Sequence, residues 1–134
     1  MSSGFRFPHR NHCKSFLLQL FKKEKKSLEL LNYIFCTDEY LLDINRSFLQ
    51  HDYYTDIITF ELAEKGEPTQ GEVYISIDRV RDNAKLHGQS FQRELHRVIF
   101  HGALHLCGYR DKTKKEETLM RQKEEEYLSY YFKG

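Results

Sequence analysis

Two histidines and an aspartate in the last third of the chain have the spacing of a metal site. His101 and His105 are four residues apart, and Asp111 follows six residues after the second histidine. Residues four apart share one face of a helix, so both imidazoles can reach one ion. Gly108 can end that helix with a positive φ and turn the chain back toward the same point. Two histidines and one carboxylate suit zinc, and also iron or manganese.

The complete pattern, HxxxHxxGxxD, has the spacing of the long zinc motif of metzincin proteases, in which the third ligand is a histidine. Those proteases carry a water-activating glutamate directly after the first histidine, where this sequence has Gly102. Without this glutamate, metal-dependent peptide hydrolysis by the route of those proteases has no general base. The spacing therefore predicts a metal site, while a metalloprotease-like hydrolase stays an alternative that Gly102 weakens. A buried helix whose histidines bind nothing is the simplest alternative.

The segment that holds the histidines is predicted to be a long helix from Ser90 through Cys107. Its apolar residues lie on two opposite faces, which is typical of a central helix packed on both sides. Glu94 shares the stripe of the two histidines and could orient one of them or satisfy a structural neighbour. His96 lies about 140° around the helix from His101 and is expected to face away. One face holds Leu95, Val98, Ile99, Gly102 and Leu106, and the other holds Phe100, Leu104 and Cys107.

The remaining segments predict an α+β fold in a single domain over residues 1–134, with several helices around a small mixed sheet. Helix starts are expected at Thr37, at Asp78 and at the capping box Thr113–Glu116. No linker long enough to separate two domains is present. The other expected elements are a helix over 11–26, strands over 28–36, 55–62 and 72–77, and a turn-forming connection over 63–71.

Composition is ordinary for a globular protein of this size. The chain has 134 residues and is 40% hydrophobic, enough to form a core without staples. The apolar clusters are too short to span a bilayer, and no secretory signal pattern is present. Three cysteines without a CxxC pair suit reduced thiols in a cytosol.

Charge is unevenly distributed along the chain. The net charge is +1, but residues 1–36 carry seven Lys or Arg against two Glu. This basic third could attract nucleic acid, although a solvated helix face explains the charge as well. Nine tyrosines and ten phenylalanines offer faces on which bases could stack, but most are expected in the core.

Residues 101–111, HGALHLCGYRD, resemble the hallmark HGxLHLxGYDH of the YbeY-type bacterial endoribonucleases. LDINRSFLQHDYYTDIITF is similar to that family's Thr-Asp block, and GEVYIS to its Gly-Asp-Ile-x-Ile-Ser strand. Glu94-Leu95 and Met120…Glu124 match two further family features. The resemblance covers roughly residues 44–125 and is specific, because the hallmark occurs together with the Thr-Asp strand.

The resemblance implies a metal-dependent endoribonuclease that acts on single-stranded rRNA, in maturation of the small-subunit rRNA 3′ end and in ribosome quality control. It implies one divalent metal ion, with zinc expected, on a zincin-like site of the central helix formed by His101, His105 and Asp111. RNA is the expected partner, together with the ribosomal small subunit or its proteins, in the cytoplasm and without a membrane. A non-catalytic ribosome-assembly factor with a structural metal is the alternative from another class.

Three positions near the expected site depart from the family pattern. Asp111 stands where the family has its third histidine, which makes the site more negative, and Arg110 stands where the hallmark has an aspartate. Leu49 stands where the family usually carries an arginine thought to contact RNA, and leucine cannot pair with phosphate. Arg46, one helical turn earlier, is a weak candidate for that role. Glu72 is a weak candidate for a general base, and Asp56 also lies at a strand end, but no base is assigned firmly.

Overall fold

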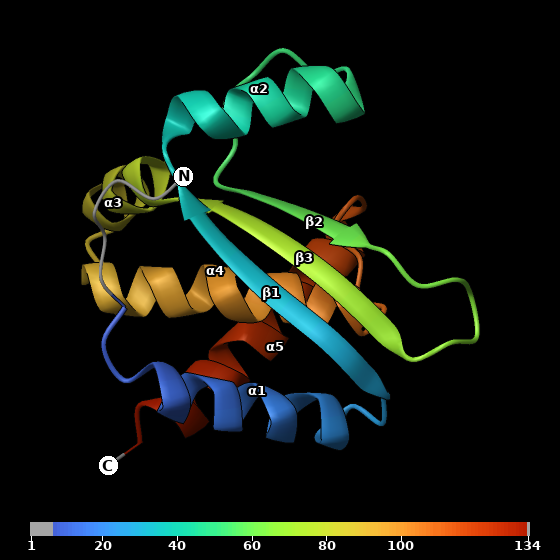
Figure 1. The fold of residues 1–134 in the computed structure, drawn as a ribbon. Coiled ribbons are helices and arrows are strands. Elements are labelled where there is room, and N and C mark those ends of the chain that lie inside the picture. The colour runs from blue at the N-terminus through green and yellow to red at the C-terminus, as the bar shows by residue number, and fades with distance from the viewer. Residues whose placement is uncertain (1–6, 134) are drawn as a thin grey trace.

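A three-stranded mixed sheet organises the molecule in its computed structural model, which describes residues 7–133. The strands are β1 (Leu28–Cys36), β2 (Ile57–Glu61) and β3 (Thr69–Ser76). Their order is β1-β3-β2, with β1 parallel and β2 antiparallel to β3 (Figure 1). β3 therefore lies at the centre, and its β-branched residues suit a strand with neighbours on both sides.

Helices cover both faces of this sheet (Figure 1). Val73 of β3 faces the larger core, which is shared with the central helix, whereas Tyr74 faces a smaller cluster under α2. This split follows from the period of two along a strand, because successive side chains point to opposite faces. The helices are α1 (Arg10–Lys23), α2 (Asp38–Leu49), α3 (Ile77–Leu86), α4 (Phe91–Leu106) and α5 (Lys114–Tyr131).

α4 is the central helix that the sequence predicts. The Ser90 hydroxyl caps its first turn by accepting the Arg93 amide hydrogen at 3.1 Å. Its apolar residues are buried by the sheet on one side and by α1 and α5 on the other. The capping box of α5 is also present, with Thr113 and Glu116 bonded to each other's backbone. The single small α+β domain is thereby confirmed.

Several expected boundaries differ from the structure. α1 ends at Lys23 and not at residue 26, and β2 covers Ile57–Glu61 and not the whole of 55–62. α3 begins at a cap formed by Ser76, not Asp78, because the Ser76 hydroxyl accepts the Arg79 amide hydrogen at 3.1 Å. The Asp78 carboxylate instead accepts the amide hydrogen of Asp38, at 3.0 Å. β3 begins at Thr69, three residues earlier than predicted, because residues 69–71 pair with the start of β1.

The three cysteines are all free and buried, in agreement with the expected reduced thiols. Burial raises the pKa of Cys13 and Cys36 to about 11 each, and that of Cys107 to about 12. Within residues 7–133, no helix has the length and hydropathy that a membrane crossing requires.

Candidate metal centre

His101 and His105 lie on consecutive turns near the end of α4, as the spacing predicts. Their rings are stacked, with centroids 6.1 Å apart and planes inclined by 22°. His105 is exposed, whereas His101 is partly covered. The pair therefore presents two imidazoles side by side at the protein surface, on a helix that the core holds rigidly.

The orientation of His101 is set by a buried carboxylate of α5. Its Nδ1 lies 2.6 Å from Oε2 of Glu124, whose side chain is only 2% exposed. A carboxylate can only accept, so Nδ1 carries the hydrogen and Nε2 faces the other way. Nε2 lies 3.3 Å from Oδ2 of Asp111. Two ligand atoms on one tetrahedral zinc ion are about 3.4 Å apart, so this distance is compatible with a shared ion.

The orientation of His105 is set by the turn that follows α4. Its Nδ1 lies 2.8 Å from the Tyr109 carbonyl oxygen, which fixes the hydrogen on Nδ1 and leaves Nε2 as the acceptor nitrogen. Gly108 makes this turn possible with a φ of 109°. The amide groups of Gly108 and Tyr109 bond back to His105 and Leu104, which is the pattern of a Schellman motif.

Tyr109 is anchored in turn by Glu24, a residue distant in sequence at the end of α1. Its hydroxyl donates to Glu24, directly after α1, at 2.8 Å, and the hydroxyl of Tyr127 donates to the other oxygen of the same carboxylate. Burial acts to raise the pKa of Glu24, but these two hydroxyl donors and Lys123 lower it overall. Glu24 therefore holds the turn whose carbonyl orients His105.

Arg97 forms ion pairs with the carboxylates beside His101. It donates to Glu94 at 2.7 Å and to Glu124 at 3.0 Å, and it lies 3.9 Å from Asp56. Burial alone would raise the pKa of Glu124, but the hydrogen bonds from His101 and Arg97 lower it. The pKa of Asp56 is raised, because its burial outweighs the attraction of Arg97. Glu94 is thus paired with Arg97, whereas Glu124 is the carboxylate that accepts the hydrogen bond from His101.

Other candidate residues lie elsewhere. Arg46 is on α2 and pairs with Asp52 at 2.5 Å and with Asp43 at 4.0 Å. Glu72 accepts the Tyr74 hydroxyl hydrogen at 3.3 Å, on the face of the sheet that α2 covers. The structure does not bring Arg46 or Glu72 to the two histidines. His96 is buried away from the site, as expected, with Nδ1 at 2.7 Å from the Gln92 carbonyl oxygen.

Gly102 faces the sheet rather than the site. A Cβ atom at this position would lie 2.9 Å from Cγ1 of Val73 and 3.1 Å from Cδ1 of Ile57. A glutamate here would be directed into the core, not toward the two histidines. This packing agrees with the argument from the sequence against protease chemistry.

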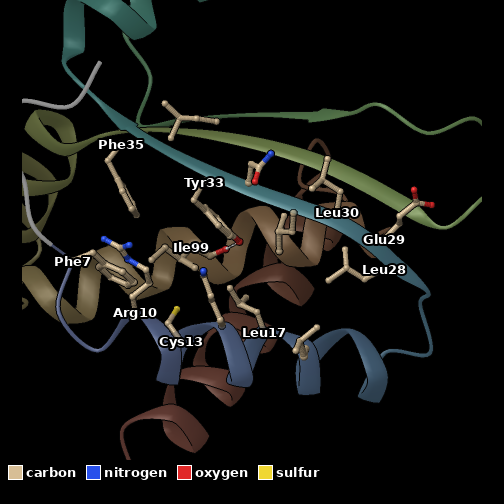
Figure 2. A pocket seen from close by; sticks show the side chains of 15 residues that line it. Phe7, Arg10, Cys13, Leu17, Leu28, Glu29, Leu30, Tyr33, Phe35 and Ile99 are labelled. Carbon is tan, nitrogen blue, oxygen red and sulfur yellow. Dashed lines mark hydrogen bonds between the residues drawn. The ribbon is translucent and has the colours of Figure 1, made fainter.

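Two hollows on the surface differ in chemistry. The hollow beside His101 and Asp111 has a volume of about 540 Å³ and is also lined by Thr118, Arg121 and Gln122 of α5. A larger one, of about 770 Å³, lies between α1 and β1, where Tyr33 and Phe35 point from the strand toward the helix (Figure 2). The larger hollow is mainly apolar and lies away from the histidine pair. The placement of titratable groups, and not size, favours the smaller hollow as the functional one.

His101 and Asp111 approach each other, but three converging side chains are not found. Among residues 7–133, no group of three or more His, Cys, Asp and Glu side chains is arranged to hold a metal ion. The zincin-like site expected from the sequence therefore stays a prediction. Sequence reasoning also missed the link from Glu124 to His101. The available signal was an acid on the apolar stripe of α5 that holds Met120, Tyr127 and Leu128.

Comparison with known proteins identifies the family. The family model described as Endoribonuclease YbeY matches residues 7–131. An endoribonuclease YbeY from Cytophaga hutchinsonii is 54% identical over 93% of this chain and 87% of that relative. One from Porphyromonas gingivalis is 52% identical over 77% of this chain and 68% of the relative. The solution structure of a Thermotoga maritima protein is similar, with a TM-score of 0.65 and 27% identity over 95% of this chain and 85% of that protein.

The α+β domain presents two oriented histidines and a neighbouring carboxylate, which are residue types that metal-dependent hydrolases use as ligands. The chain belongs to the endoribonuclease YbeY family, because the family model spans most of it and relatives at about half identity cover most of its length. The resemblance seen in the sequence is confirmed.

Proposed function

We propose that this protein is a metal-dependent endoribonuclease that cleaves single-stranded rRNA, with His101, His105 and Asp111 holding one divalent ion. The observation that carries the proposal is the fixed orientation of the two imidazoles. Both Nδ1 atoms donate their hydrogen to an oxygen, of Glu124 or of Tyr109. Both Nε2 atoms therefore keep a lone pair with which they can bind a metal. Zinc is the expected metal because it accepts nitrogen and carboxylate ligands in this combination.

The donor set fits a catalytic ion better than a structural one. Structural zinc sites usually have four protein ligands, whereas catalytic sites have three and keep one position open. Cys107 is buried at the end of α4 and is not a fourth ligand in this proposal. An ion held by these residues would supply a Lewis acid for phosphodiester hydrolysis.

The residues of the chain supply orientation and charge balance. Glu124 holds His101 in one tautomer, and the Tyr109 carbonyl does the same for His105. Arg97 compensates the charge of Glu124, so the carboxylate stays ionised in a buried place. These contacts already restrict the rotation of both imidazoles. Metal binding therefore costs less conformational entropy than it would with freely rotating rings.

The proposed substrate is the 3′ end of the small-subunit rRNA, and the proposed setting is ribosome maturation and quality control in the cytoplasm. This part rests on the family, whose relatives are named endoribonucleases. Contact with the small ribosomal subunit or its proteins is expected to add specificity. The basic segment of the sequence from Arg6 to Lys26 is a candidate for long-range attraction of RNA.

The test compares metal content and RNA cleavage in three proteins. The wild-type protein should hold about one metal ion per chain and cleave unstructured RNA, and chelation should abolish the cleavage. His105→Ala should lose both the metal and the activity. His87→Ala, an exposed histidine after α3, is the matched control and should keep both.

Two outcomes would contradict the proposal. Cleavage that survives in His105→Ala after the metal is lost would come from a contaminant and would favour the assembly factor. Cleavage of casein without cleavage of RNA would instead favour the metalloprotease-like hydrolase.

A further inference from the structure

We propose that Arg121 of α5 forms a phosphate-binding subsite for the RNA backbone beside the candidate metal centre. The inference rests on the proposed function, because it assigns a role in the same reaction. Arg121 lines the 540 Å³ hollow together with His101 and Asp111. Its side chain is 65% exposed, so an incoming polyanion can reach its guanidinium.

Arg121 is the cation of this hollow that keeps unused donors. Arg97 also lines it, but its side chain is 16% exposed and three carboxylates surround it. Arg121 lies 3.9 Å from Oε1 of Glu124, an oxygen that already accepts from Arg97 at 3.0 Å. A guanidinium has five N–H donors in a planar fork that matches two phosphate oxygens. One long ion pair leaves most of that fork available.

α2 offers no arginine that is free to bind phosphate in this hollow. Leu49 ends α2 and cannot pair with phosphate. Arg46 is held by Asp52 and Asp43 and does not line the hollow. A phosphate that enters the hollow beside His101 therefore meets its accessible arginine on α5.

Neighbours on α5 extend the subsite along the hollow. The side-chain amide of Gln122 makes no hydrogen bond within residues 7–133, and Gln122 lines the hollow next to Arg121. Thr118 donates its hydroxyl hydrogen to the Lys114 carbonyl at 3.0 Å, so its oxygen is left as an acceptor. An amide and a hydroxyl oxygen suit the sugar and base edges of a single strand, while the arginine suits its phosphate.

Charge balance couples this subsite to the metal. The hollow is lined by three carboxylates, from Asp111, Glu117 and Glu124, against the two guanidinium groups of Arg97 and Arg121. These carboxylates outnumber the guanidinium groups by one, and a divalent ion would reverse the sign of that balance. RNA should bind weakly to the metal-free protein and more tightly to the loaded one, with Arg121 providing the anchor.

The test measures binding and not cleavage. The probe is a fluorescein-labelled oligouridylate with 2′-O-methyl groups and phosphorothioate linkages, and its anisotropy is followed with zinc-loaded full-length protein over a range of salt concentrations. Arg121→Gln should raise the Kd about five- to tenfold at low salt. It should also make the slope of log K against log[salt] shallower by about 0.7, the value for one phosphate contact on a single strand.

Two further variants separate a subsite from a general loss of charge. Lys115→Gln makes the same change of charge on the same helix, about 120° around from Arg121, and should leave the Kd within about twofold and the slope unchanged. Arg121→Lys should keep the slope but lose part of the affinity, because an ammonium cannot bind phosphate in a bidentate way. Arg121 is exposed, so the fold is expected to persist in all three, as checked by circular dichroism.

The outcomes distinguish this inference from the proposed function. If the wild-type protein binds the probe and cleaves RNA, but Arg121→Gln binds like Lys115→Gln, the subsite is refuted while the nuclease stands. If the loaded wild-type protein neither binds the probe nor cleaves RNA, the proposed function fails, and the subsite fails with it.

Discussion

Replacing Gly102 by alanine tests how closely α4 approaches the sheet. The new Cβ would lie 2.9 Å from Cγ1 of Val73 and 3.1 Å from Cδ1 of Ile57. Alanine is favoured over glycine in a helix by about 0.8–1 kcal/mol. Overpacking of a well-packed core costs about 1–3 kcal/mol. Since both contacted side chains are held within the sheet, we expect the steric cost to be the larger, with a net loss of about 1 kcal/mol.

The assay is urea unfolding of both proteins in the presence of a chelator, because metal binding would otherwise add to the free energy of unfolding. A matched background is Val73→Ala, which removes Cγ1 and Cγ2 of Val73, at 2.9 and 3.4 Å from the new Cβ, and leaves the contact with Ile57 at 3.1 Å. In that background Gly102→Ala should become neutral or stabilising, by up to about 1 kcal/mol. If Gly102→Ala stabilises the otherwise unchanged protein by that amount, the close approach of α4 to β3 is refuted.

Substitutions at three further positions address the site and the core. Glu124→Gln should weaken zinc binding about 10- to 100-fold, measured by competition with a chromophoric chelator, because a neutral amide polarises His101 less; unchanged affinity would remove Glu124 from the site. Asp111→His should retain zinc while Asp111→Ala should lose affinity in the same titration, and equal affinities of these two variants would exclude Asp111 as a ligand. Burial lowers the pKa of His96 below 6.5, so on acidification the unfolded chain takes up the proton first. The stability associated with a neutral His96 is therefore complete above pH 6.5 and falls as the pH drops toward the folded pKa. His96→Phe should flatten that part of the urea-unfolding profile, and a parallel pH dependence in both proteins would speak against it.

Local signals made much of the fold predictable. The caps at Ser90 and Thr113 join side chains to backbone groups three residues away, so the short sequence that forms them contains the whole interaction. β1 occupies its predicted range, residues 28–36. The cap of α3 was misassigned because Ser76 and Asp78 are both good capping residues, and the choice depends on Asp38, forty residues earlier in the chain.

The partners of the two histidines had no local signal. Glu124 is 23 residues from His101, and Glu24 is 85 residues from Tyr109. Which acid meets which histidine is decided by the packing of α1 and α5 against α4, and residue spacing does not contain that information. The i, i+4 spacing placed His101 and His105 side by side, but the stripe on α4 equally suggested Glu94 as their neighbour. Arg97 takes Glu94 instead.

The reactivity of the three buried thiols can be used to measure local unfolding of the protein. Cys13 lies on α1, Cys36 ends β1 and Cys107 caps α4, so each reports on a different element. A thiol reacts only as an exposed thiolate, and here burial opposes both exposure and ionisation. Alkylation under native conditions therefore has to wait for the surrounding element to loosen. Cys107 immediately precedes the turn that orients His105. Its alkylation rate would therefore report how often that turn opens, and no cysteine would have to be introduced for the measurement.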